Sequence, residues 1–133
     1  AALSSLCAPL LYLAGYADQI QKIMKSISTH ILDVSRGKPA AGVHVKLDHF
    51  SGGDFKRAAE GVTDADGRVR DWQFTLVAGT WRIRFEVAAY FENLKEAYFY
   101  PYVEIVFQVH DSEQHYHVPL LLSAYGYSTY RGS

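Results

Sequence analysis

The sequence QHYHVPLLLSAYGYSTYRGS, at residues 114–133, combines the pattern of a half-buried strand with two closely spaced histidines. Side chains of an extended chain alternate between two faces. The first face, which is mainly apolar and is expected to pack in a core, carries Tyr116, Val118, Leu120 and Leu122. The second face carries His115, His117, Pro119, Leu121 and Ser123. A face that mixes ionisable and apolar groups is expected at a site that a second subunit covers.

The composition predicts one folded domain and excludes several partners. The chain has 133 residues, of which 49% are hydrophobic and 14% aromatic, and such a chain can bury a single core. Thirteen basic and fourteen acidic residues give a net charge of -1, so neither nucleic acid nor an anionic membrane is an expected partner. Cys7 is the only cysteine, which excludes an internal disulfide and a zinc site built from cysteines.

Residues 1–26 differ from the rest of the chain. The apolar run at residues 10–17 is shorter than the roughly 20 residues that a membrane span needs. Small residues near it fit the remnant of a targeting peptide, but the basic region that should precede such a remnant is absent. We expect residues 1–26 to be a loosely ordered N-terminal extension or a targeting remnant, and residues 27–133 to form the domain.

Residues 27–131 show the alternation of short strands separated by turn signals. The predicted strands cover residues 27–34, 43–47, 55–62, a segment opening at Arg68, 81–87, 103–109, 115–123 and 125–131. One short helix is predicted at residues 88–97, where Ala, Leu, Glu and Lys replace the strand alternation. The spacing of these strands predicts an all-β fold with one short helix, arranged as a β-sandwich.

The histidines fall into two groups. The first group, expected to be exposed on polar strand faces or at a turn, is His44, His49 and His110. The second group is His115 and His117, an H-x-H pair of the kind that presents two imidazoles to zinc, with His30 as a third ligand. The same imidazoles can instead act as general acids or bases, with Arg68 as a fixed cation for an anionic substrate or oxyanion. The residue pattern leaves both alternatives open.

Several separated sequence blocks carry a family resemblance. They are STHILD at 28–33 with GKPA at 37–40, DGR at 66–68, FYPYVE at 99–104, HYHVPLLLS at 115–123, and the ending YRGS at 130–133. In this order over residues 27–133, they resemble the transthyretin-like family and, within it, the 5-hydroxyisourate hydrolases of purine breakdown. The resemblance implies a sandwich of two four-stranded sheets and a homotetramer, a dimer of dimers whose active sites lie at the dimer–dimer interface.

The resemblance also implies site residues and a reaction. The implied catalytic residues are His30, Arg68, His117 and Ser133. The implied substrate-binding residues are His30, Arg68, His117, Tyr130, Arg131 and Ser133. The implied reaction is hydrolysis of 5-hydroxyisourate to 2-oxo-4-hydroxy-4-carboxy-5-ureidoimidazoline by a water molecule, without a cofactor or a metal.

Two other functions remain alternatives to this enzyme. The first is a carrier of small aromatic ligands in the manner of transthyretin, in which the positions of His30, Arg68 and His117 hold different residues. The second is a zinc-binding protein that uses His30, His115 and His117. Relatives implied by the resemblance occur in the cytoplasm, peroxisome and periplasm. Localisation therefore stays open: the cytoplasm or the peroxisome is expected first, and the periplasm or secretion is the alternative if residues 1–23 are a targeting remnant.

Overall fold

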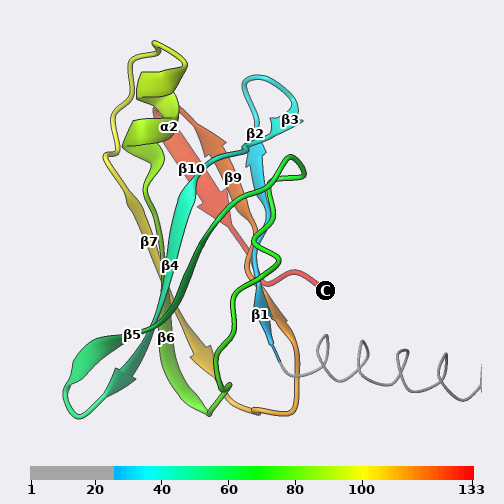
Figure 1. The fold of residues 1–133 in the computed structure, drawn as a ribbon, viewed down its shortest axis with the longest axis vertical. Coiled ribbons are helices and arrows are strands. Elements are labelled where there is room, and N and C mark those ends of the chain that lie inside the picture. Colours follow the sequence, from blue (N-terminus) through cyan, green and yellow to red (C-terminus); the bar gives the residue numbers. More distant parts are fainter. Residues whose placement is uncertain (1–25) are drawn as a thin grey trace, which may run out of the picture.

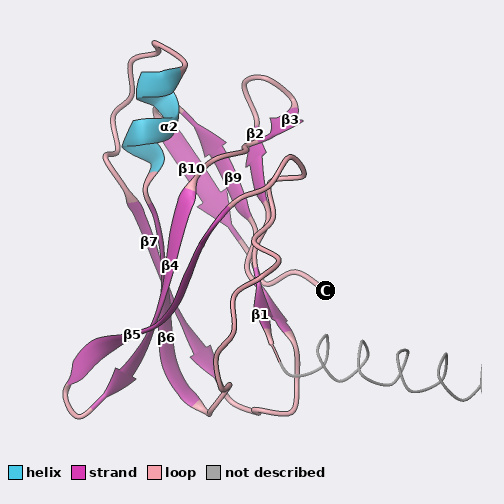
Figure 2. Cartoon of the chain, in the orientation of Figure 1, coloured by secondary structure: helices cyan, strands magenta, loops and turns pink. Residues whose placement is uncertain are grey.

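The computed structural model describes residues 26–133, so the N-terminal extension expected at residues 1–26 lies, except for Ser26, outside the described residues. The strands are β1 (Ile27–Ser28), β2 (Ile31–Asp33), β3 (Lys38–Pro39), β4 (His44–Ser51), β5 (Asp54–Val62), β6 (Gly79–Phe85), β7 (Val103–Val109), β8 (Tyr116–His117), β9 (Leu120–Ser123) and β10 (Gly126–Thr129). The described helix is α2 (Val87–Asn93), which lies at one end of the strands (Figure 2). No helix within residues 26–133 is long and apolar enough to cross a membrane.

Two four-stranded sheets pack face to face (Figure 1), which confirms the predicted all-β sandwich. One sheet has the strand order β5-β4-β6-β7, and all of its pairings are antiparallel. The other has the order β10-β9-β2-β3, and its central pair, β2 and β9, is parallel. The short strands β1 and β8 extend this parallel pair as a separate two-stranded ladder.

The core lies between the two sheets and follows the predicted alternation. On β6, Trp81, Ile83 and Phe85 are buried, while the residues between them are partly exposed. The face predicted to be apolar on the opposite sheet is confirmed, with exposures of 4%, 5%, 0% and 1% in the order Tyr116, Val118, Leu120 and Leu122. Burial of each large apolar side chain contributes about 1.5–3 kcal/mol to stability, so this core fixes which face of the strands points outward.

The parallel ladder joins two segments that are far apart in the sequence. The N–H groups of Tyr116, Val118 and Leu120 donate to carbonyl oxygens of the facing strand, each at 2.9 Å. The Thr29 hydroxyl donates to the Val118 carbonyl oxygen at 2.7 Å at the point where the regular pairing is interrupted. The strands predicted at residues 27–34 and 115–123 are therefore each divided in two, as β1 with β2 and β8 with β9.

The helix predicted at residues 88–97 is wrong at its C-terminal end, because α2 stops at Asn93. Lys95 adopts a left-handed conformation with φ 57°. The N–H groups of Lys95 and Glu96 donate to the carbonyl oxygens of Glu92 and Phe91, each at 3.0 Å. This is the Schellman pattern that ends helices. It forms here without the glycine that usually signals it in a sequence.

The strand predicted to open at Arg68 is also wrong, because residues 69–78 contain no regular strand. Arg68 forms an isolated antiparallel bridge with His30 and does not begin a strand. The following segment is held by side chains instead. The Trp72 indole donates to the Ile27 carbonyl oxygen at 3.1 Å, and both Trp72 and Phe74 pack against the core. Alternation alone did not distinguish this anchored segment from a strand.

Candidate active site

Arg68 is held beside His30 by a close backbone contact. The Ile31 N–H donates to the Gly67 carbonyl oxygen at 2.9 Å, next to the bridge between His30 and Arg68. Gly67 has φ 75°, and a Cβ there would lie only 2.5 Å from the Ile31 carbonyl oxygen. A side chain at this position would therefore push the turn away from the strand. The glycine allows the turn to place the arginine next to the histidine.

The turn before Arg68 is organised by Asp64. One oxygen of this carboxylate, Oδ1, accepts hydrogen bonds from the backbone N–H groups of Asp66, at 2.9 Å, and Arg68, at 3.1 Å. The other, Oδ2, accepts from the Arg70 guanidinium at 2.6 Å. The hydrogen bond from the Arg68 N–H, followed by those from Arg70 and Asp66, lowers the pKa of Asp64. The turn is therefore held by an ionised carboxylate.

Arg68 and Arg70 differ in their ion pairs. The Arg70 guanidinium donates to the carboxylates of Asp64 and Asp66. Within residues 26–133, the Arg68 side chain pairs with no carboxylate. Because the acidic groups of the turn are engaged by Arg70 and by backbone, the exposed guanidinium of Arg68 is left to bind an anion.

His117 lies on β8, directly opposite Ser28 in the parallel ladder. Its Nδ1 is 2.7 Å from the Ser28 hydroxyl. Its Nε2 makes no hydrogen bond to any described residue and is not enclosed, so this nitrogen is open to a water molecule or a substrate. Partial burial, together with the positive charge of Arg68 and the imidazoles of His115 and His30, lowers the pKa of His117. The ring is therefore neutral at pH 7.

His115 lies on the same outward face as His117 but contacts two serines. Its Nδ1 is 2.9 Å from the Ser26 hydroxyl, and its Nε2 is 2.9 Å from the Ser28 hydroxyl. Burial lowers the pKa of His115, so this imidazole is also neutral at pH 7. No sequence motif assigns a role to Ser28. Its contact with two histidines depends on the pairing of strands that are 89 residues apart.

The C-terminal end returns to His117. The Gly132 N–H donates to the His117 carbonyl oxygen at 2.8 Å, and the two residues form an antiparallel bridge. A Cβ at Gly132 would collide with Cδ2 of the His117 ring. Figure 1 shows this end of the chain beside β1, on the side away from β4 and β6. Ser133, which follows Gly132, is exposed next to the predicted site.

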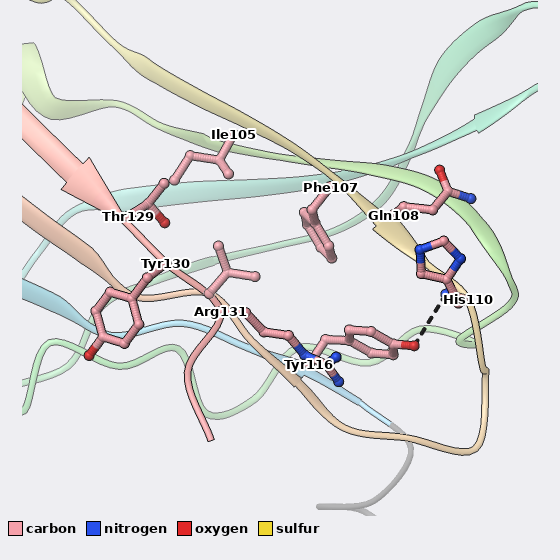
Figure 3. Close-up of a pocket in the computed structure, with 9 residues that line it drawn as sticks. Ile105, Phe107, Gln108, His110, Tyr116, Thr129, Tyr130 and Arg131 are labelled. Carbon is pink, nitrogen blue, oxygen red and sulfur yellow. Dashed lines mark hydrogen bonds between the residues drawn. The ribbon is translucent and has the colours of Figure 1, made fainter.

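Tyr130 and Arg131 line a different part of the molecule. They border a pocket of about 440 Å³ that also contains Tyr116 and Phe107 and opens between β7 and β10 (Figure 3). The Arg131 guanidinium lies 4.7 Å from the centre of the Tyr116 ring and donates to the Gln114 side chain at 3.2 Å. The structure thus brings His30, Arg68 and His117 together, whereas Arg131 contacts the opposite face of β8.

The remaining histidines lie on other parts of the surface or against the core. His44 and His110 are exposed as predicted, but His49 is half-buried and its ring packs 4.6 Å from the Trp81 ring, measured between centres. Among residues 26–133, no group of three or more histidine, cysteine or acidic side chains is arranged to hold a metal ion. The geometry gives no support to the proposed zinc ligands His30, His115 and His117.

Comparison with known proteins shows the family to which the chain belongs. Residues 27–132 match the model of the HIUase/Transthyretin family. The chain belongs to the HIUase/transthyretin family. One family member, a probable 5-hydroxyisourate hydrolase of Caenorhabditis elegans, is 47% identical over 111 residues, which cover 81% of this chain and 82% of that protein. The resemblance seen in the sequence is therefore confirmed.

Solved structures of the family share the sandwich. The 5-hydroxyisourate hydrolase of Klebsiella pneumoniae superposes with a TM-score of 0.71 at 37% identity, covering 80% of this chain and 98% of that chain. Sea bream transthyretin, solved in complex with thyroxine, gives a TM-score of 0.76 at 33% identity, covering 80% of this chain and 93% of that chain. The fold occurs in a hydrolase and in a thyroxine complex. The function of this family member must therefore be argued from its site.

Proposed function

We propose that this chain is a 5-hydroxyisourate hydrolase that acts in urate breakdown. The observation that carries the proposal is the pairing of a neutral imidazole, whose Nε2 is open, with an arginine that has no carboxylate partner within residues 26–133. A neutral imidazole accepts a proton from water, and an unpaired guanidinium binds a developing oxyanion. Two family members support the same assignment: a probable 5-hydroxyisourate hydrolase at 47% identity and a solved 5-hydroxyisourate hydrolase at 37% identity.

The proposed first step is attack of water on the C6 carbonyl of 5-hydroxyisourate. Nε2 of His117 accepts the proton from the water as the new C–O bond forms. Arg68 binds the substrate oxygen on which negative charge develops, because its guanidinium is placed beside His30 on the same surface. General base help of this kind accelerates a reaction by about 10²–10⁴-fold.

The second step is collapse of the tetrahedral intermediate. The N1–C6 bond breaks, the carbonyl carbon becomes a carboxylic acid, and N1 receives the proton that His117 had accepted; the acid then releases its own proton to water and becomes the carboxylate. His30 shares protons with this site, and Ser133 lies next to it through the contact of Gly132 with His117. The product is 2-oxo-4-hydroxy-4-carboxy-5-ureidoimidazoline. No metal is required, because the two histidines and Arg68 provide both the proton transfer and the positive charge.

The proposal includes a homotetramer, a dimer of dimers whose active sites are covered at the dimer–dimer interface. Val34 is 52% exposed on the surface that also carries His30 and His117, and Leu32 and Leu121 are only partly covered there. Strands β7 and β10 also form open sheet edges within the described chain. Apolar groups around a polar site and unpaired edges are both expected where further copies of the chain bind.

A transthyretin-type carrier is the second candidate, because sea bream transthyretin shares the fold and was solved with thyroxine. A carrier needs an apolar channel and has no use for a neutral base beside an unpaired cation. The environment of His117 and Arg68 therefore favours the hydrolase. Thyroxine binding without hydrolysis would support the carrier.

The experiment that tests the function follows the absorbance of 5-hydroxyisourate generated in place by urate oxidase. The wild-type chain should accelerate its decay equally with and without EDTA, and His117→Ala should abolish the acceleration. His44→Ala is the matched control, because His44 is exposed on β4 in the other sheet, and this variant should keep wild-type activity. Equal activity of the His117→Ala and wild-type proteins would contradict the proposed base.

A further inference from the structure

A chain of four hydrogen-bonding side chains leads away from the proposed base. It runs from His117 Nδ1 to the Ser28 hydroxyl at 2.7 Å, on to His115 Nε2 at 2.9 Å, and from His115 Nδ1 to the Ser26 hydroxyl at 2.9 Å. Ser28 is thus placed between two imidazoles by the register that sets Ser28 opposite His117. The catalytic steps described above use only Nε2 of His117, so they give no role to this series of hydrogen-bonded side chains.

The chemistry of a hydroxyl limits how this chain can be protonated. Ser28 has one hydrogen to donate and can accept from the other neighbour. If both facing ring nitrogens carried hydrogen, the Ser28 hydrogen would have no acceptor among residues 26–133. One of the two nitrogens must therefore donate to Ser28 and the other must accept from it. Because neutral imidazole carries a single hydrogen, this choice fixes both rings.

Only two arrangements satisfy every partner. In the first, His117 Nδ1–H donates to Ser28, Ser28 donates to His115 Nε2, and His115 Nδ1–H donates to Ser26. In the second, every donor is reversed, and His117 then carries its hydrogen on Nε2. Only the first arrangement leaves the open Nε2 nitrogen of His117 without hydrogen, which is what a base requires.

We propose that Ser28 and His115 are positioning residues that hold His117 in its base-competent tautomer and take up the proton between the two steps of hydrolysis. When Nε2 accepts a proton from water, Nδ1–H passes its proton to Ser28 while Ser28 passes its own to His115 Nε2. His115 then carries the positive charge and His117 is neutral with hydrogen on Nε2. The reverse shift restores His117 Nδ1–H as Nε2 delivers its proton to N1 of the substrate. No proton is gained or lost.

The surrounding charges favour moving the proton in this direction. The groups that face His117 are Arg68 from the turn, His30 from the neighbouring strand segment and His115 from its own strand, and all of them disfavour a positive charge there. His115 is opposed mainly by its burial, and Arg68 is not among the groups that lower its pKa. A proton stored on His115 is therefore removed from the direct field of Arg68.

The inference rests on the proposed function for its two chemical steps, but its structural core can be tested without substrate. In protein labelled with ¹⁵N-histidine at a pH at which both rings are neutral, the ring-nitrogen NMR shifts report which nitrogen carries hydrogen. The wild-type protein should show His117 protonated at Nδ1. His115→Phe removes the acceptor of the Ser28 hydrogen, so Ser28 should then donate to His117 and move the hydrogen of that ring to Nε2.

Activity provides the second readout. Ser28→Ala should lower kcat by about 10–100-fold with little change in KM, the range found for groups that orient metal-binding histidines. Ser28→Thr keeps the hydroxyl and should restore the wild-type tautomer and most of kcat. Ser51→Ala, in the β4–β5 hairpin, is the matched serine control and should leave both readouts unchanged.

Two results would overturn the proposed role of Ser28 and His115. The first is a wild-type His117 that carries its hydrogen on Nε2. The second is a folded His115→Phe or Ser28→Ala protein in which the His117 nitrogen shifts remain those of the wild type. A protein that shows the expected tautomers but does not hydrolyse 5-hydroxyisourate would refute the proposed function and leave the arrangement of the four side chains intact.

Discussion

Both sheets carry arginines on or beside their outer faces, but these arginines differ in their ion pairs. On the sheet that contains β4 and β6, the buried carboxylate of Asp48 accepts from Arg57 at 2.6 Å and from Arg82 at 2.9 Å. Burial alone would raise the pKa of Asp48, but the hydrogen bonds and the positive charges of the two arginines together outweigh it and the pKa is lowered. On the opposite face, Arg68 has no carboxylate partner within residues 26–133 and lies near His117.

The difference separates a structural use of arginine from a chemical one. Arg84 likewise donates to Glu86 at 2.5 Å and to Glu104 at 3.0 Å, so Arg57, Arg82 and Arg84 are all paired with carboxylates of the same sheet. An arginine in such a pair stabilises the sheet but offers no net charge to a ligand. Arg68 keeps its charge available and also depresses the pKa of the nearby base. Substitutions on the two faces should therefore have opposite consequences for activity and stability.

Reversal of the charge at Arg68 should have the largest effect. Arg68→Glu removes the oxyanion partner and places a like charge beside an anionic substrate. We expect kcat/KM to fall by at least about 10²–10³-fold, the cost of removing one such donor. The unfolding midpoint should stay close to that of the wild type, because the side chain is exposed and makes no ion pair within the described chain. Steady-state kinetics and thermal unfolding measure both effects, and wild-type kinetics would remove Arg68 from the mechanism.

A methyl group at Gly132 should have the next largest effect. Because a Cβ there would collide with the His117 ring, Gly132→Ala must displace either the ring or the C-terminal residues. We expect a loss of about 10-fold or more in kcat, as for other small displacements of catalytic groups. Gly126→Ala is the matched control, since its Cβ would lie 3.7 Å from the Ser123 hydroxyl, which is an ordinary contact. Equal kcat in the two variants would contradict a positioned His117 ring.

The positive charge of Arg68 should have a measurable effect on the pKa of His117. Burial and then Arg68 lower the pKa of His117 from its ordinary value of 6.5, so activity that requires the neutral ring should be lost only as the pH falls below that value. Arg68→Gln removes a positive charge and should raise the pKa of His117 toward 6.5. An NMR titration of the ring measures this shift. Arg82→Gln, on the other sheet, should leave the titration unchanged, and an equal shift in both variants would show a non-specific effect.

Loss of Arg82, which is paired with a carboxylate, should have the smallest effect on activity and should instead lower stability. Arg82→Gln removes one of the two cations that contact buried Asp48, while Arg57 remains. We expect the free energy of unfolding to fall by about 1.5–3 kcal/mol, as for one hydrogen bond to a charged group, with kcat/KM within about twofold of wild type. Urea unfolding followed by circular dichroism gives the first value. A large loss of activity would contradict the claim that Arg82 has a structural role and no catalytic one.

Much of the fold could be predicted because it depends on local pattern. The alternation at residues 115–123 correctly separated buried Tyr116 and Val118 from outward-facing His117. The end of α2 could not be read in the same way, since Lys95 adopts a left-handed conformation without a glycine. The segment after Arg68 has strand-like residues but is held by Trp72 bonding to the backbone of β1. That contact depends on tertiary structure.

The site was predictable in its residue types and less so in its connections. His30, Arg68 and His117 came from resemblance, and the structure brings them together. The contact of Ser28 with both His115 and His117 requires the parallel register of distant strands, which no local pattern encodes. The absence of a carboxylate partner for Arg68 within residues 26–133 depends in the same way on the turn, where Asp64 and Asp66 already bind Arg70.

The most direct test of the account is the rate at which purified wild-type protein removes preformed 5-hydroxyisourate in a stopped-flow instrument. A neutral His117 with an open Nε2, beside an Arg68 that has no carboxylate partner within residues 26–133, should make the decay rate rise in proportion to protein concentration, with 2-oxo-4-hydroxy-4-carboxy-5-ureidoimidazoline as the product. A decay that stays at the spontaneous rate at every protein concentration would contradict the proposed chemistry.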